Sequence, residues 1–273
     1  MCAGAPVAGS ACAQMMPRMV LLVAWAPLSG YPSAMIHAPT DDPVVIVQHE
    51  AAAHAGTLLE TLVNAGLTVD VRQLHAGARV PAVEELGEIA GLVVLGGSMN
   101  ADQAAEFPFI DRERRLLVAA VEAGLPVLGI CLGGQQLAAA VGGRVYARAV
   151  PEVGWLPVEI VRSDGLLRGI ESPFCALEWH AQSFTVPAEA EVLALRSGDP
   201  GVQAFRMGRR AWGVQFHAEV DESILRFWLA RDNKGVARRD PELHARLVAS
   251  IAQVVADSRL LCRRLVENFV AAF

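Results

Sequence analysis

The sequence predicts an α/β protein with a doubly wound, mostly parallel sheet flanked by helices. Two observations support this fold class. Short apolar runs rich in valine, isoleucine and leucine alternate with stretches of helical periodicity in the first half of the chain. Each run ends at glycine or polar residues, as expected where a buried parallel strand ends. Strands and helices that alternate at this spacing form βαβ units, which place helices on the faces of the sheet.

The regular pattern begins at Pro43. The expected buried strands of the first half are 44–47, 67–71, 92–95 and 127–130. The expected helices are 55–65, 110–123 and 132–141, each closed by glycine. Strands predominate in the second half, over 156–161, 174–179, 191–195, 202–205 and 211–216. A final helix is expected to start at Asp240, with Pro241 at its first position, and to run to about Phe273 with a weak point at 257–258.

The chain divides into three expected parts. Residues 43–230 form the main domain, and residues 231–273 form a C-terminal helical segment. Residues 1–42 are expected to be a disordered extension, or to reflect a start codon placed too early, with Met35 as the alternative start. The apolar run 19–26 is short, begins late and is not followed by a good cleavage site, which disfavours a signal peptide.

Composition excludes several classes of function. The net charge of −6 argues against binding nucleic acid through a basic face, and no apolar run is long enough to span a membrane. The only lysine, Lys234, lies in a polar stretch, which argues against a phosphate loop or a pyridoxal Schiff base. The five cysteines are scattered and form no Cys-x-x-Cys pair. We therefore expect a cytoplasmic protein with no metal and no cofactor.

A candidate nucleophile lies between the strand at 127–130 and the helix that follows. Cys131 has Gly129 two residues before it and Gly133 two residues after it. A nucleophile on a sharp strand-to-helix turn needs small residues at these positions, because the backbone is crowded there. The helix N-terminus would also favour the thiolate form of Cys131.

The nucleophile needs a base and donors for a developing oxyanion. His217 is the best candidate base, and Glu219 lies on the same side of an extended chain, where it could orient the imidazole. The backbone N–H groups of Gly97 and Leu132 are the expected oxyanion donors, because both follow the ends of parallel strands. Among the other histidines, His49 and His180 are candidate pocket residues.

These motifs together resemble the class I glutamine amidotransferases, which use a Cys-His-Glu triad. The motifs are Gly-Ile-Cys-Leu-Gly-Gly-Gln, an upstream Leu-Gly-Gly-Ser and a downstream Gln-Phe-His-Ala-Glu. The segments 152–155 and 178–184 are similar to the stand-alone branch likened to the GMP synthetase amidotransferase domain and to γ-glutamyl peptidases. The resemblance covers about residues 43–230 and implies a flavodoxin-like sheet.

The resemblance also implies a chemistry. Cys131 would attack the γ-carbonyl of a glutamyl substrate, and His217, supported by Glu219, would move the protons. It further implies that Gln135, Gly96 and the backbone of Ser183 and Phe184 bind the substrate. The sequence departs from the family pattern at Ser98 and Ala218, which replace prolines, and at Gln182, which replaces an aspartate.

Three functions remain open at this point. The chain would be a glutaminase that supplies ammonia to a separate synthetase protein, or a stand-alone γ-glutamyl hydrolase, peptidase or transferase. The third alternative is a non-catalytic regulatory module on the same fold, which the intact set of Cys131, His217 and Glu219 disfavours.

Overall fold

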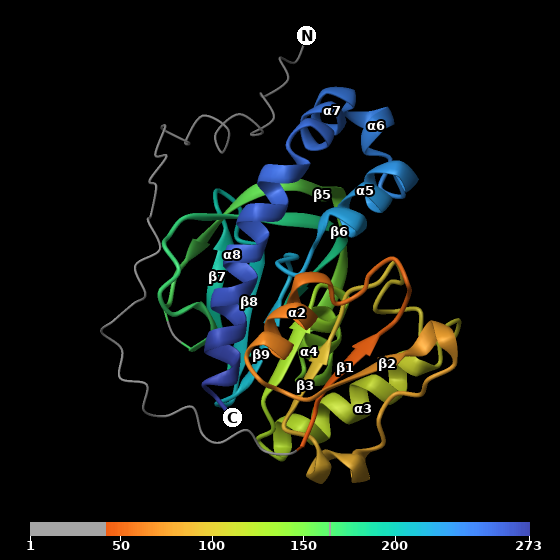
Figure 1. The fold of residues 1–273 in the computed structure, drawn as a ribbon, viewed down its shortest axis with the longest axis vertical. Coiled ribbons are helices and arrows are strands. Elements are labelled where there is room, and N and C mark those ends of the chain that lie inside the picture. Colours follow the sequence, from red (N-terminus) through yellow and green to blue (C-terminus); the bar gives the residue numbers. More distant parts are fainter. Residues whose placement is uncertain (1–41, 164) are drawn as a thin grey trace.

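The computed structural model describes residues 42–163 and 165–273, so the extension expected at the N-terminus lies almost entirely outside the described residues. The described strands form one nine-stranded sheet in the order β2-β1-β3-β4-β9-β8-β7-β5-β6. Helices cover both faces of this sheet (Figure 1). The α/β fold class predicted from the sequence is therefore confirmed.

One half of the sheet is parallel, as expected. Its strands are β1 (Val44–Gln48), β2 (Val69–Gln73), β3 (Gly91–Val94), β4 (Val127–Ile130) and β9 (Ala211–Val214). The helices of this half are α2 (Gly56–Asn64), α3 (Phe109–Glu122) and α4 (Leu132–Ala140), with 3-10 turns η1 (Leu74–Ala76) and η2 (Val83–Glu88). Most of these boundaries lie within one or two residues of the predicted ones, because buried strands and glycine-ended helices are local patterns.

The other half of the sheet is antiparallel. The sheet is therefore mixed, whereas the sequence predicted a mostly parallel one. Its strands are β5 (Arg144–Ile160), β6 (Phe174–Thr185), β7 (Glu191–Arg196) and β8 (Val202–Met207). The connections from β7 to β8 and from β8 to β9 are short and hold no helix, and short connections impose antiparallel pairing. Strands β5 and β6 are also longer than predicted. The first half of β5 carries charged side chains on an exposed surface, so it lacks the apolar run on which the prediction of a strand relied.

Alternate residues of the parallel strands enter two separate cores. Ile46 and Leu128 face the cluster that contains α2 and the C-terminal helix α8 (Ile251–Val270). Val45 and Val94 face the cluster that contains α3 and α4. This alternation is the two-residue period of a strand, and it leaves both faces of the sheet covered by helices.

The C-terminal helices complete the fold. They are α5 (Glu222–Arg231), α6 (Val236–Arg239), α7 (Pro241–Ala249) and α8. Asp240 caps α7 as predicted, since the N–H of Leu243 donates to its side chain at 2.8 Å. The break in the final helix falls at Ser250 and not at 257–258, because Ser258 lies on the buried face of α8.

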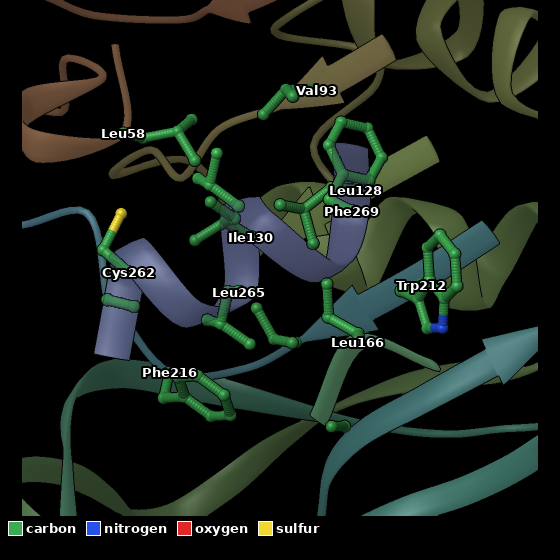
Figure 2. Close-up of a cluster of buried hydrophobic side chains, with 14 of the residues drawn as sticks. Leu58, Val93, Leu128, Ile130, Leu166, Trp212, Phe216, Cys262, Leu265 and Phe269 are labelled. Atoms are coloured by element: carbon green, nitrogen blue, oxygen red, sulfur yellow. The ribbon is translucent and has the colours of Figure 1, made fainter. Parts of the chain in front are cut away.

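Helix α8 packs against the sheet rather than standing apart from it. Its residues Cys262, Leu265 and Phe269 lie in one cluster with residues of β4 and β9 (Figure 2). The core of residues 43–230 therefore continues into the last segment of the chain. Within the described residues, no helix is both long enough and apolar enough to cross a membrane.

Candidate active site

Cys131 lies on a strained turn between β4 and α4. Its backbone has φ 51° and ψ −105°, a conformation that non-glycine residues seldom adopt and that often marks functional sites. A Cβ on Gly129 would lie 2.5 Å from the carbonyl oxygen of Gly133, and one on Gly133 would lie 2.1 Å from the oxygen of Val94. The predicted need for glycine on both sides of the cysteine is thus confirmed in steric terms.

His217 and Glu219 follow β9 and meet Cys131 at the carboxyl edge of the parallel strands. Nδ1 of His217 lies 2.7 Å from Oε1 of Glu219, and the imidazole also hydrogen-bonds the Cys131 side chain. All three residues are buried. Gln215, which precedes His217 on the same side of the extended chain, donates a hydrogen bond from Nε2 to Sγ of Cys131 at 3.7 Å. The structure therefore brings the three predicted residues together and adds Gln215.

The charges of this group support one another. Burial by itself would raise the pKa of Cys131, but the charge of His217 and its hydrogen bond lower the pKa below the ordinary value of a thiol. Burial by itself would lower the pKa of His217, but Glu219 and Cys131 raise it well above its ordinary value. Both shifts favour a thiolate beside an imidazolium, the combination of a nucleophile and a proton donor that acyl transfer uses.

The glycine pair after β3 lies against this group. A Cβ on Gly96 would lie 3.0 Å from Cε1 of His217 and 3.5 Å from Cβ of Cys131, and one on Gly97 would lie 3.1 Å from Cδ2 of Leu132. Leu132 is the first residue of α4, so its N–H has no partner within the helix. The two predicted oxyanion donors thus lie on segments that touch each other and the nucleophile.

A buried ion pair holds the glycine pair from behind. Nε2 of His49 lies 2.7 Å from Oε2 of Glu113, and Nδ1 of His49 lies 2.9 Å from the carbonyl oxygen of Gly96. Burial opposes a charge on His49, but Glu113 and the Gly96 carbonyl raise its pKa. His49 was a candidate pocket residue, and the structure places it behind the glycine pair and outside the pocket lining. Glu113 was not predicted, although it occupies an inward position of the amphipathic helix α3.

The departure from the family pattern at Ser98 has a structural explanation. The N–H of Ser98 donates to Oε1 of Glu50 at 3.0 Å, and its hydroxyl donates to Oε2 at 2.7 Å. Proline at this position could make neither hydrogen bond. Ser98 therefore fixes the Glu50 carboxylate beside the glycine pair, in place of the stiffness that proline would supply.

The predicted substrate-binding residues lie on the α4 and β6 side of Cys131. Nε2 of Gln135 donates to the carbonyl oxygen of Gln182 at 3.0 Å and to Oε1 of Gln215 at 3.3 Å. Ser183 and Phe184 are buried in β6, and Phe184 packs in the α3–α4 core. None of Gln135, Ser183 or Phe184 lines the pocket that contains Cys131. Gln182, in place of aspartate, accepts a hydrogen bond from the N–H of Ala101 at 2.9 Å.

His180 is the centre of a buried ion-pair cluster next to these residues. Its Nε2 lies 3.0 Å from Oε2 of Glu152 and 3.0 Å from Oε2 of Glu178, and its Nδ1 lies 2.8 Å from the oxygen of Gln182. Burial opposes the charge, but the two carboxylates raise the pKa of His180 to about 9. These groups are close enough to bind a metal ion, but a protonated His180 has no lone pair to offer one. The positive charge of His180 also acts on the Cys131 thiolate.

The pocket beside Cys131 contains several residues that were not predicted from the sequence. Its lining is Glu50, Ala53, Gly97, Ser98, Cys131, Trp179, His217, Trp228, Asn233 and Lys234. The ring of Trp228 packs edge-on against the ring of His217, with the ring centroids 4.8 Å apart. Nε1 of Trp179 donates a hydrogen bond to Oδ1 of Asn233 at 3.1 Å. Lys234, which was considered from the sequence only for a phosphate loop or a Schiff base, lies in the lining of this pocket. Trp228 lies on the buried face of α5, and no local pattern in the sequence predicted its contact with His217.

The comparisons with known proteins agree with this geometry. The model of the family described as "Glutamine amidotransferase class-I" matches residues 53–226. The chain is 33% identical over 181 residues to a GMP synthase of Aeropyrum pernix. The match covers 64% of this chain but only 34% of the length of that GMP synthase. It is 31% identical over 214 residues to the glutamine amidotransferase-like protein YfeJ of Salmonella typhimurium, which covers 76% of this chain and 88% of that protein.

The solved structures give the same result. The crystal structure of a glutamine amidotransferase from Thermotoga maritima superposes with a TM-score of 0.74 at 26% identity and covers 85% of this chain and 99% of that one. One from Methylobacillus flagellatus superposes with a TM-score of 0.70, also at 26% identity, and covers 83% of this chain and 95% of that one. Together with the cysteine turn and the mixed sheet, these matches show that the chain belongs to the class I glutamine amidotransferase family.

Proposed function

We propose that this protein hydrolyses the γ-amide of glutamine or of another γ-glutamyl compound through a cysteine thioester. The observation that carries the proposal is the buried, hydrogen-bonded series of Cys131, His217 and Glu219 at the carboxyl edge of the parallel strands. A nucleophile, a base and a group that orients the base are the three parts that acyl transfer needs.

The first half of the reaction forms the thioester. The thiolate of Cys131 attacks the γ-carbonyl carbon, and the carbonyl oxygen becomes an oxyanion that accepts hydrogen bonds from the N–H groups of Gly97 and Leu132. The imidazolium of His217 gives its proton to the leaving nitrogen, and the C–N bond breaks. Ammonia or an amine departs, and the γ-glutamyl group remains on sulfur.

The second half releases the product. His217, now neutral, removes a proton from a water molecule that attacks the thioester carbon. The C–S bond breaks, glutamate leaves, and the thiolate of Cys131 and the imidazolium of His217 are restored. Glu219 stabilises the charged imidazole in both halves, because its carboxylate lies 2.7 Å from Nδ1.

Substrate binding is assigned on the resemblance to the family. Gly96, Gln135, Ser183 and Phe184 would hold the amino-acid end of the γ-glutamyl group. Gln135 lies on α4 and Ser183 and Phe184 lie on β6, whereas Gly96 follows β3 and lies against Cys131 and His217. The side chain of Gln135 would exchange its hydrogen bond to Gln182 or Gln215 for one to the substrate.

Two settings for this chemistry differ in the fate of the nitrogen. In the first, a separate synthetase accepts the ammonia, a setting suggested by similarity to proteins named GMP synthase. In the second, the protein acts alone as a γ-glutamyl hydrolase or peptidase. A cytoplasmic location suits both settings. The lone lysine in the active-site pocket favours the second, because ammonia carries no group for it to bind.

The test is an assay of purified protein against glutamine and a panel of γ-glutamyl compounds, with glutamate as the measured product. We expect turnover in the wild type, at least a ~1,000-fold loss in Cys131→Ala, and a smaller loss in Glu219→Gln. Rapid turnover without a partner would count against dependence on a synthetase. Equal activity of the wild type and Cys131→Ala would overturn the thioester mechanism and return attention to a non-catalytic role.

A further inference from the structure

The single lysine of the chain lines the same pocket as the nucleophile. Lys234 lies in the turn between α5 and α6, next to Asn233, which is bonded to Trp179. Asp232 and Gly235, on either side, adopt left-handed backbone conformations. The Asp232 carboxylate accepts hydrogen bonds from the N–H groups of Val236 and Ala237 at the start of α6. The turn that carries Lys234 is therefore held in place by local bonds.

Lys234 brings a positive charge to this pocket. Across residues 42–163 and 165–273, no carboxylate forms a salt bridge with its ammonium group. The acidic residue in the lining, Glu50, is bound through both oxygens by Ser98. The charge of Lys234 reaches the reaction centre, since it contributes to the lowered pKa of Cys131. An unpaired cation on a pocket wall is suited to bind an anion.

The position of Lys234 relates it to the leaving group. The residues proposed to hold the γ-glutamyl end, Gln135, Ser183 and Phe184, lie outside the pocket lining. The pocket is walled instead by Trp179, Trp228 and Lys234, and it opens onto Cys131. It is thus available to the group bonded to the γ-nitrogen. Ammonia, the leaving group from glutamine, has no negative charge for a lysine to bind.

We propose that Lys234 binds a carboxylate on the amine portion of the substrate, so that the enzyme prefers γ-glutamyl amino acids or peptides to glutamine. This inference rests on the proposed function of the same site. Trp179 and Trp228, whose ring centroids lie 5.7 Å apart, form the buried wall of the pocket, and Lys234 provides the charge that would bind the end of the leaving amine. Lys234 is therefore a specificity residue, which takes no part in bond making or breaking.

The first test compares two matched substrates, γ-glutamylglycine and its neutral analogue γ-glutamylglycinamide. Hydrogen bonds to charged groups contribute about 1.5–3 kcal/mol, so we expect the wild type to prefer the carboxylate substrate by ~10-fold or more in kcat/KM. Lys234→Gln should lose this preference, Lys234→Glu should reverse it, and Lys234→Arg should retain it. Lys234→Gln should lower kcat/KM for γ-glutamylglycine more than kcat/KM for glutamine, because the leaving group of glutamine carries no carboxylate.

The matched control is Arg231→Gln, which removes an exposed cation from the end of α5 that lies over the Phe227 ring. It should leave the ratio of the two substrates unchanged. The inference fails if the wild type does not distinguish the two substrates, or if Lys234→Gln slows both of them equally.

A second measurement works without turnover. Iodoacetate and iodoacetamide alkylate the same thiolate but differ in charge, so their rate ratio at Cys131 reports the cation directly. We expect Lys234→Gln to reduce the ratio of iodoacetate to iodoacetamide rates several-fold, and Arg231→Gln to leave it unchanged. An unchanged ratio in Lys234→Gln would overturn the anion site. A reduced ratio in a protein that hydrolyses no γ-glutamyl compound would support the anion site and refute the proposed function.

Discussion

The two free cysteines among the described residues are both buried, yet their surroundings drive their pKa values in opposite directions. Burial raises the pKa of the Cys262 thiol to about 12 in the apolar contact between α8 and α2. Burial acts on Cys131 in the same way, but His217 overcomes it. A neighbour that can carry a positive charge, and not exposure, therefore separates the pKa values of the two thiols.

Alkylation of Cys131 by iodoacetamide should therefore begin at lower pH than that of an ordinary thiol. A lowered pKa means that the thiolate persists as the pH falls, so the midpoint of the rate profile should lie below the usual value of about 8.5. His217→Asn should move the midpoint upward, because the stabilising charge is lost. Mass spectrometry of peptides identifies the labelled residue. Preferential labelling of Cys262 in the folded protein would contradict this assignment.

The pair of His49 and Glu113 is expected to position the oxyanion donor without touching the substrate. His49→Gln should lower kcat by about 10- to 100-fold with little change in KM. The carbonyl oxygen of Gly96 loses its contact with Nδ1 of His49. The N–H of Gly97, which belongs to the same peptide group, then no longer keeps its orientation toward the oxyanion. The control is His54→Gln, at a partly exposed histidine bonded to Ser223. A rise in KM at constant kcat, or a parallel loss in His54→Gln, would contradict the positioning role.

At the scale of elements, the site depends on how closely α4 approaches the strands. Gly133 lies in the first turn of α4, directly over the carbonyl of Val94 in β3. Gly56 makes a similar contact at the start of α2, where a Cβ would lie 2.1 Å from the carbonyl oxygen of Glu219. Glycine at these two contacts lets helices from both faces of the sheet reach the carboxyl edge of the parallel strands.

Gly133→Ala should destabilise the protein and lower activity. The added methyl would overlap the Val94 carbonyl, and overpacking of this kind costs about 1–3 kcal/mol or more in the free energy of unfolding. Urea denaturation measures the change. Gly87→Ala in η2 is the control, since a Cβ there meets nothing within 4 Å, and it should change the unfolding free energy by less than about 0.5 kcal/mol. Equal effects of the two substitutions would refute this explanation.

At the scale of the whole molecule, the C-terminal segment is part of the structural core. Phe269 of α8 is fully buried, and its ring meets that of Trp212 in β9 edge-on at 6.2 Å. Cys262 and Leu265 extend the same contact along the helix toward α2. The strand that precedes His217 is thus supported by the last helix of the chain.

Phe269→Ala should therefore reduce the free energy of unfolding by about 3–5 kcal/mol, the usual cost of removing a buried aromatic ring. Leu260→Ala, on the same helix, removes a side chain that is 69% exposed and should have little effect. Thermal unfolding of both variants distinguishes a core helix from an appended one. A small effect of Phe269→Ala would show that the last segment is separable from the main domain.

The sequence by itself determined the parallel strands, the cysteine turn and the pairing of His217 with Glu219. Each of these is a local pattern: an apolar run, a Gly-x-Cys-x-Gly turn, or the two-residue alternation of a strand. Physical constraints between near neighbours in the chain are sufficient to specify them. The α7 cap at Asp240 was predictable for the same reason.

Only the tertiary structure decided which distant residues surround that local pattern. The antiparallel half of the sheet, the ion pair of His49 with Glu113, the edge-on contact of Trp228 with His217 and the entry of Lys234 into the pocket all depend on contacts between segments far apart in the chain. Such contacts are set by the packing of whole elements against the sheet, and no local pattern encodes them. The residues proposed for the chemistry are therefore recognisable from near neighbours, whereas the fold brings Cys131 and His217 together and assembles the pocket around them.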